Sequence, residues 1–138
     1  KKVNRWIKRY GLEKRVTIKK WLPEKEDVYK EMKKARIFLM ASFSEGGPRT
    51  LVEAMTLGIP CIATPVGITK DLIEHEWNGM IVKIGDYRDL ADKISKVLLN
   101  HNLRKTITQN SVLIPPKSYS YFERITKRHS IEDPVPPS

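Results

Sequence analysis

The sequence predicts a doubly wound α/β fold, in which a parallel sheet carries helices on both faces. Residues 37–42 and 59–64 are continuous apolar runs of strand length, as in strands that are buried on both faces of a parallel sheet. Segments with a helical spacing of apolar residues separate these runs, and parallel strands need such helical crossovers. A chain of 138 residues is also long enough to bury one core of this kind.

Helices and strands are expected to alternate along the chain. Val3, Trp6, Ile7 and Tyr10 share one helical face, and Gly11 suits the position that ends a helix. The remaining expected elements are strands at 15–21, 37–42, 59–64 and 80–83, and helices that begin at Pro23, run from Pro48 to Leu57, cover 69–74, begin at Asp86 and cover 102–112.

The character of the sequence changes after Leu113. Pro115 and Pro116 break the preceding helix, and aromatic residues at 119–122 favour one further amphipathic helix. The last residues are rich in proline, which favours fraying. We therefore expect one domain over 1–113, followed over 114–138 by a C-terminal helix and a proline-rich tail.

The chain is strongly basic, with a net charge of +10 from 26 basic and 16 acidic side chains. Its lysines and arginines are scattered, and no helix-turn-helix, zinc-finger or RNA-binding aromatic signature accompanies them, so we expect no nucleic-acid partner. A solvated basic surface and an anionic membrane surface both stay open as interpretations.

The sequence contains no apolar run long enough to span a bilayer. Its single cysteine, Cys61, lies in an apolar run, which predicts a buried thiol and fits a reducing compartment. No cluster of metal-ligating residues is apparent, so no metal is expected. We expect a cytoplasmic location, and peripheral attachment at the inner face of a membrane stays open.

The chemistry is concentrated in residues 42–55. A buried strand ends at Ser42, and ligands of open α/β sheets bind outside the carboxyl ends of the strands. Gly46 and Gly47 allow close approach to the backbone, and the helix that follows offers unpaired amides for a phosphate. Glu45 and Glu53 flank this turn, and carboxylates are natural acceptors for sugar hydroxyls. The pattern indicates a ligand with phosphates in its middle and hydroxyl groups at both ends.

This ordered motif resembles the family-4 retaining glycosyltransferases of the GT-B fold. Seven residues separate Glu45 from Glu53, and the resemblance extends over residues 5–112. The context also matches: Ala54, Met55, Gly58 and Pro60 follow the second glutamate, then Ala63-Thr64-Pro65-Val66-Gly67 and Asn78-Gly79. The resemblance implies a Rossmann-like part of the C-terminal domain that binds a nucleotide sugar.

The resemblance also implies roles for individual residues. Glu45 would lie near the transferred sugar as the catalytic residue, and Glu53 would bind the ribose hydroxyls. The nucleotide base would lie near Trp21 and Leu22. The other donor-binding residues expected from the resemblance or from their place at the same crevice are Gly46, Gly47, Arg49, Thr50, Leu51, Thr64 and Gly67.

The family's reaction transfers a sugar from a nucleoside diphosphate sugar with retention of configuration and without a cofactor. The donor could be a UDP-, GDP- or ADP-sugar, because Gly47 stands where relatives often have an aromatic residue, and the acceptor a glycan or a lipid-linked molecule. Lysines at 19–20 replace a glycine that is common before the base-binding turn. The chain lacks the family's first strands, with their phosphate-binding basic pair, and its N-terminal acceptor domain, so we expect it to be inactive alone.

Other functions stay open at this point. A different GT-B enzyme, such as one of the glycogen-synthase or epimerase type, would use the same half-domain. A non-catalytic Rossmann-like module could bind a nucleotide or another anion without performing a reaction. A basic protein that docks on anionic membranes is a third class, and it is compatible with the first.

Overall fold

The chain divides into two units, Lys1–Glu31 and Met32–Ser138, in a computed structural model that describes residues 2–113. The C-terminal helix and tail that the sequence predicts over 114–138 lie outside the described residues. The domain boundary at residue 113 therefore stays a prediction.

The first unit contains α1 (Lys2–Arg9) and most of α2 (Lys25–Lys33). Gly11, with a φ of 62°, follows α1 where the sequence places the end of the helix. The strand predicted over 15–21 is wrong, because these residues form no strand. Alternating β-branched residues favour an extended backbone, but a strand also needs a neighbour for its amides and carbonyls, and these residues pair with no described strand.

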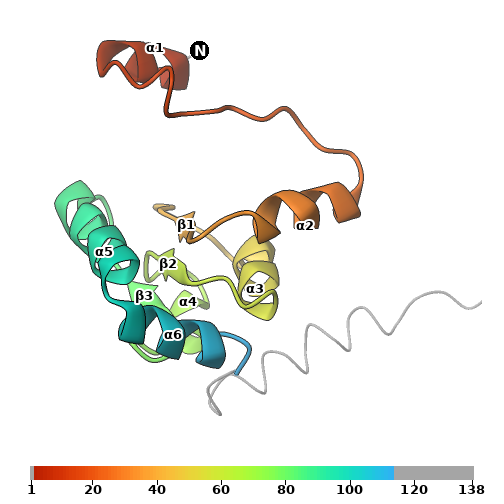
Figure 1. Cartoon of the computed structure of the whole chain (residues 1–138), viewed down its shortest axis with the longest axis vertical. Helices are drawn as coiled ribbons and strands as arrows, with labels where there is room; N and C mark the ends of the chain where they lie inside the picture. The colour runs from red at the N-terminus through yellow and green to blue at the C-terminus, as the bar shows by residue number, and fades with distance from the viewer. Residues whose placement is uncertain (1, 114–138) are drawn as a thin grey trace, which may run out of the picture. The chain divides into compact units, whose positions relative to one another are not determined.

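The second unit is built on a parallel sheet of three strands in the order β1-β2-β3 (Figure 1). The strands are β1 (Phe38–Met40), β2 (Cys61–Ala63) and β3 (Met80–Ile81), and Leu39 pairs with Ile62, which also pairs with Met80. The connecting and flanking helices are α3 (Arg49–Thr56), α4 (Thr69–Leu72), α5 (Tyr87–Leu99) and α6 (His101–Asn110).

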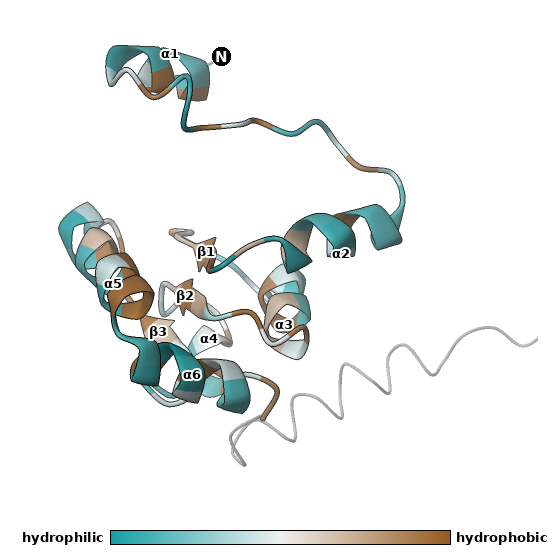
Figure 2. Ribbon diagram, in the orientation of Figure 1, coloured by the Kyte–Doolittle hydropathy of each residue, from teal (hydrophilic) through white to brown (hydrophobic). Residues whose placement is uncertain are grey.

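The core lies on both faces of this sheet, which confirms the predicted fold class. Successive residues of β2 point to opposite faces. Cys61 and Ala63 join a buried cluster with Leu51 and other residues of α3 and α4, whereas Ile62 packs with Val97 of α5 and its neighbours. Figure 2 shows the hydrophobic side of α5 turned toward the strands.

The helix ends follow local sequence signals closely. Asp86 caps α5, because its side chain accepts hydrogen bonds from the amides of Arg88 and Asp89 at 3.1 and 2.9 Å. Pro48 is the residue before the first turn of α3 rather than its first helical residue, and Gly58, with a φ of 73°, follows the last turn. Among residues 2–113, no helix combines the length and the apolarity needed to cross a membrane.

The thiol of Cys61 is expected to be unreactive in the folded chain. Burial raises its pKa to about 12, and its sulfur donates to the carbonyl of Ile59 at 3.1 Å. A maleimide at neutral pH should therefore label the native chain far more slowly than the chain in guanidinium chloride. Equal labelling rates under the two conditions would contradict the burial of this side chain.

Candidate functional site

The candidate site lies at the carboxyl ends of β1 and β2. Residues 41–48 leave β1 and lead into α3, and residues 64–68 leave β2 and lead into α4. Because the two strands are parallel neighbours, both loops meet at one edge of the sheet. This edge is where open α/β sheets bind their ligands.

A buried threonine ties these two loops together. The side chain of Thr64 is 2% exposed, and its hydroxyl donates to the carbonyl of Ser42 at 2.6 Å and points toward that of Met40 at 3.3 Å. The amide of Thr64 also donates to Met40 at 3.0 Å. These hydrogen bonds from Thr64, which directly follows β2, fix the path of the chain after β1.

Gly67 supports the loop from the same side. Its φ is +52°, and a β-carbon at this position would lie 2.2 Å from the carbonyl oxygen of Glu45 and 2.8 Å from that of Gly46. Backbone atoms cannot rotate out of the way as a flexible side chain can. Only glycine therefore lets the Glu45–Gly46 backbone lie where it does.

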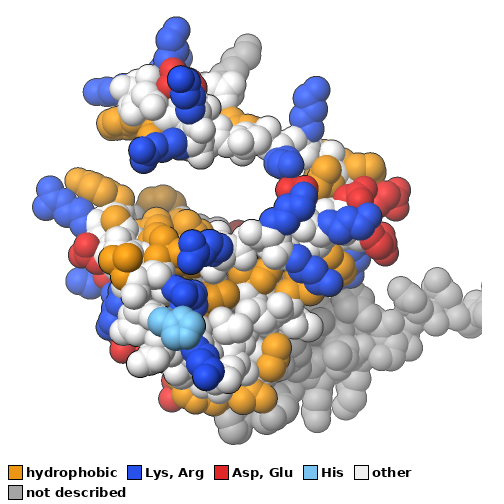
Figure 3. Space-filling model, viewed as in Figure 1, with side chains coloured by type: hydrophobic (Ala, Val, Ile, Leu, Met, Phe, Trp, Pro, Cys, Tyr) orange, Lys and Arg blue, Asp and Glu red, His pale blue; other side chains and the backbone are white. Residues whose placement is uncertain are grey.

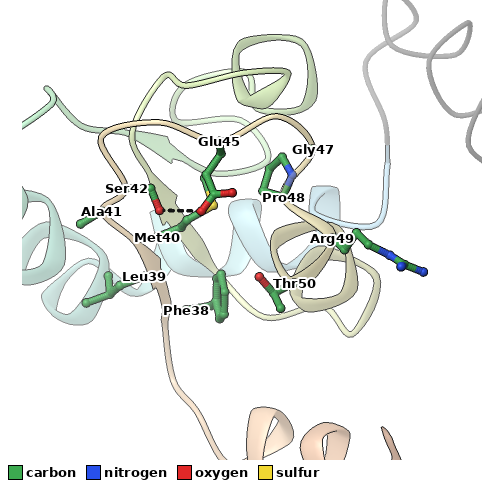
Figure 4. A pocket seen from close by; sticks show the side chains of 10 residues that line it. All are labelled: Phe38, Leu39, Met40, Ala41, Ser42, Glu45, Gly47, Pro48, Arg49 and Thr50. Atoms are coloured by element: carbon green, nitrogen blue, oxygen red, sulfur yellow. Dashed lines mark hydrogen bonds between the residues drawn. The ribbon is translucent and has the colours of Figure 1, made fainter.

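Glu45 lies in a hollow of about 560 Å³ beside β1 and the start of α3. Its carboxylate accepts a hydrogen bond from the Ser42 hydroxyl at 3.0 Å (Figure 4). Gly47, Arg49 and Thr50 line the same hollow. The carboxylate is exposed and held by one neighbour, so a hydroxylated ligand can reach it.

The first turn of α3 forms one wall of the hollow. The amide of Leu51 donates to the carbonyl of Pro48 at 3.1 Å, and its side chain is fully buried, so it cannot touch a ligand through that side chain. No backbone acceptor is recorded for the Thr50 amide among residues 2–113. The side chain of Arg49 is directed away from Glu45 (Figure 4).

Of the residues predicted to bind the donor, Glu45, Gly47, Arg49 and Thr50 line the hollow. Glu53 lies just over one turn along α3, half-buried, and is not among the residues that line the hollow. Trp21 and Leu22 belong to the first unit, so their contribution to this site stays a prediction. Gly46 is exposed, and a β-carbon there would meet nothing within 4 Å.

The sequence predicts Ser42 only as the end of a strand, whereas the structure shows its hydroxyl donating to the Glu45 carboxylate. A hydroxyl residue three positions before a glutamate at a strand end is the pattern that could have indicated this contact. Residues 2–113 contain no group of three or more histidine, cysteine or acidic side chains that could hold a metal ion.

Comparison with known proteins shows which family the chain matches. The family model described as Glycosyl transferases group 1 matches residues 1–112. An uncharacterized glycosyltransferase of Methanocaldococcus jannaschii is 33% identical over 85 residues, which are 62% of this chain and 24% of that protein. The UDP-Gal:alpha-D-GlcNAc-diphosphoundecaprenol alpha-1,3-galactosyltransferase of Escherichia coli is 26% identical over 87 residues, 63% of this chain and 22% of that protein. The chain therefore spans about a quarter of the length of these relatives.

Solved structures show the same fold. HepE of Anabaena in complex with UDP-glucose has a TM-score of 0.78 and 26% identity, over 94% of this chain and 36% of that one. The C-terminal domain of a glycosyl transferase group 1 family protein, LpcC, from Francisella tularensis has a TM-score of 0.75 and 23% identity. That second match covers 88% of this chain and 60% of the other. These matches confirm the predicted fold class, that of the C-terminal domain of GT-B glycosyltransferases.

Gly67→Ala should displace the loop that carries Glu45. Gly58→Ala is the matched control, because Gly58 also has a positive φ but has open space where a β-carbon would lie. We expect Gly58→Ala to cost about 1 kcal/mol of unfolding free energy, and Gly67→Ala about 2 kcal/mol or more, because the backbone must also shift. Urea unfolding gives the energies, and amide NMR shifts of Glu45 and Gly46 report the displacement. Equal costs with unmoved amides would show that the contact is unimportant.

Proposed function

The chain belongs to the glycosyl transferases group 1 family, and we propose that it is the donor-binding part of a retaining glycosyltransferase. The whole enzyme would transfer a sugar from a nucleoside diphosphate sugar to a glycan or lipid-linked acceptor. The observation that carries this proposal is the placement of Glu45, a carboxylate held by Ser42 at the strand end beside the first turn of α3.

The proposed donor lies with its diphosphate against the start of α3. The amides of the first helical turn and the helix dipole favour an anion there. Gly46 and Gly47 have no side chain that could block the approach of phosphate oxygens to the backbone. A carboxylate next to these phosphates would repel them, so Glu45 must face an uncharged part of the donor. Sugar hydroxyls meet that requirement, because they donate hydrogen bonds to a carboxylate.

Glu53 is proposed to bind the ribose hydroxyls. It lies on α3 beyond the first turn, so its carboxylate is separated from Glu45 by the proposed phosphate site. The order of groups along this segment then matches the order along the donor. Glu45 would face the sugar, the amides at the start of α3 the diphosphate, and Glu53 the ribose. Thr64 and Gly67 act in this proposal by fixing the loop, and their backbone lies at the same edge of the sheet.

The chemical step depends on how the departing diphosphate is stabilised. As the bond between sugar and phosphate breaks, negative charge grows on the phosphate oxygens. Helix amides that already point at this position stabilise the charge without reorganising, which is commonly the largest catalytic contribution. Glu45 would orient the sugar above them, and an oriented carboxylate also favours the positive charge that develops on the sugar ring.

We propose a uridine nucleotide as the first donor to test. HepE was solved with UDP and with UDP-glucose, and the name of the Escherichia coli relative specifies UDP-Gal. Trp21 is 89% exposed, so its indole is available for stacking on a base. GDP and ADP remain the alternatives that a titration separates.

Turnover is proposed to need a further domain. In the proposed enzyme, an N-terminal domain of the GT-B type binds the acceptor and closes over the donor, which excludes water from the reacting sugar. The 138-residue chain is therefore expected to bind nucleotide but not to transfer sugar. A non-catalytic nucleotide-binding module is the competing proposal, and loss of transfer by Glu45→Gln in the two-domain enzyme argues against it.

Calorimetric titration of UDP, GDP and ADP tests the donor site. We expect saturable binding of one nucleotide, weakened by about 1.5–3 kcal/mol in Glu53→Ala, because a charged hydrogen bond to the ribose is lost. Glu74→Ala is the control, because it removes an exposed carboxylate that follows the C-terminal end of α4. This variant should bind the nucleotide as tightly as the unmodified chain does.

Two results would contradict the assignment. Equal binding of all three nucleotides, unaffected by Glu53→Ala, would indicate attraction to a basic surface rather than a ribose contact. Equal weakening by Glu53→Ala and Glu74→Ala would show that net charge, not the position of Glu53, decides the affinity.

A further inference from the structure

A second hollow lies at the opposite edge of the sheet. It has a volume of about 450 Å³ and is formed by the end of α2, the segment that enters β2, and α6. Pro60, on its wall, directly precedes β2, whereas the candidate donor site follows the carboxyl ends of β1 and β2. The two hollows are therefore separate, and the proposed function makes no use of this one.

Basic side chains from distant parts of the sequence line the second hollow. Among residues 2–113, its lining includes no acidic residue and five basic ones. Figure 3 shows lysine and arginine side chains around a histidine on the face over α6. We call this cavity the basic hollow. Its five basic residues are Lys33, Arg36, His101, Arg104 and Lys105.

The charges of the basic hollow are not neutralised by carboxylates in residues 2–113. Lys93 and Lys96 of α5 are paired with Asp89 and Glu76, but no ion pair is recorded for Lys33, Arg36 or Lys105 in this part of the chain. Bringing like charges together is unfavourable, so solvation of a single charged helix face does not account for their convergence.

Arg104 is held in place within the basic hollow. One guanidinium nitrogen donates to the carbonyls of Leu98 and Val97 at 2.6 and 3.3 Å, and the other lies 3.4 Å from Nδ1 of His101. The carbonyls at the end of α5 carry only partial negative charge. They therefore orient the guanidinium, which is half-buried, without cancelling its charge.

We propose that the basic hollow binds a phosphate-bearing anion. The fixed guanidinium of Arg104 can still donate to phosphate oxygens from Nε–H and from its second terminal nitrogen, and the flexible lysines around it can close on the same group. The volume is within the range of small-ligand pockets. Leu57 and Pro60 form an apolar floor that suits a short organic part of the ligand. The phosphate comes from a free phosphate ester or from a phospholipid headgroup, and both sources share this chemistry.

The test compares two charge-matched double variants of the 138-residue chain. Arg36→Gln with Lys105→Gln removes two charges from the basic hollow. Lys70→Gln with Lys83→Gln removes two charges from exposed positions outside it. Thermal unfolding and circular dichroism confirm that both variants keep the fold of the unmodified chain.

The free ligand is probed with inorganic pyrophosphate at constant ionic strength. We expect saturable NMR shifts of the Arg104 Nε–H and the Lys105 amide, with affinity at least about tenfold weaker in the first variant and unchanged in the second. The Gly46 and Thr50 amides report any separate binding at the donor site. If no ligand binds at the donor site, the shifts of Arg104 and Lys105 still test binding in the basic hollow.

The headgroup is probed with vesicles of phosphatidylglycerol and of phosphatidylcholine. Cosedimentation with phosphatidylglycerol alone, reduced only in the first variant, supports a phospholipid source. Pyrophosphate binding without vesicle binding supports a free phosphate ester. The proposal is overturned if neither probe binds, if binding survives Arg36→Gln with Lys105→Gln, or if both double variants weaken it equally.

Discussion

The candidate site depends on one buried hydroxyl, that of Thr64. A buried hydroxyl that lacks a partner costs about 1–3 kcal/mol, and here the acceptors are backbone carbonyls at the end of β1. This contact fixes where the chain turns away from the sheet. Gly67, three residues later, then leaves room for the Glu45–Gly46 backbone. Ser42, whose carbonyl accepts the Thr64 hydroxyl, also donates its own hydroxyl to the Glu45 carboxylate, so the connection reaches Glu45 through one residue.

The parallel sheet also explains why the hollow that holds Glu45 and the basic hollow lie apart. Parallel strands place all loops that follow strands at one edge and all loops that precede them at the other. Helix N-termini and small residues gather at the first edge, near Glu45. Helix C-termini and the basic residues that favour them gather at the second, near Arg104. A diphosphate at the first edge and another anion at the second are therefore compatible within one small domain.

The sequence predicts the sheet well where burial alone decides the structure. Residues 37–41 and 59–63 are apolar throughout, and both segments contain strands. Residues 15–21 alternate and form no strand, because pairing depends on a distant neighbour. The local pattern from Glu45 to Glu53 predicts the loop and the helix start at the site. The tie from Thr64 to Ser42 spans 22 positions, and the contact of Gly67 with Glu45 is equally non-local. Neither contact produces a periodic pattern in the sequence. The sequence therefore indicates a loop at the crevice but not the two contacts that hold this loop in place.

In the proposed function, a nucleotide binds at the carboxyl ends of β1 and β2 against the start of α3. NMR titration of the ¹⁵N-labelled 138-residue chain with UDP tests it most directly, because each amide reports its own surroundings. We expect saturable shifts at Gly46, Thr50 and Thr64, with little change at Lys93 and Lys96 of α5, which line neither hollow. Shifts spread evenly over the basic surface, or confined to Arg104 and Lys105, would contradict the assignment of the donor site.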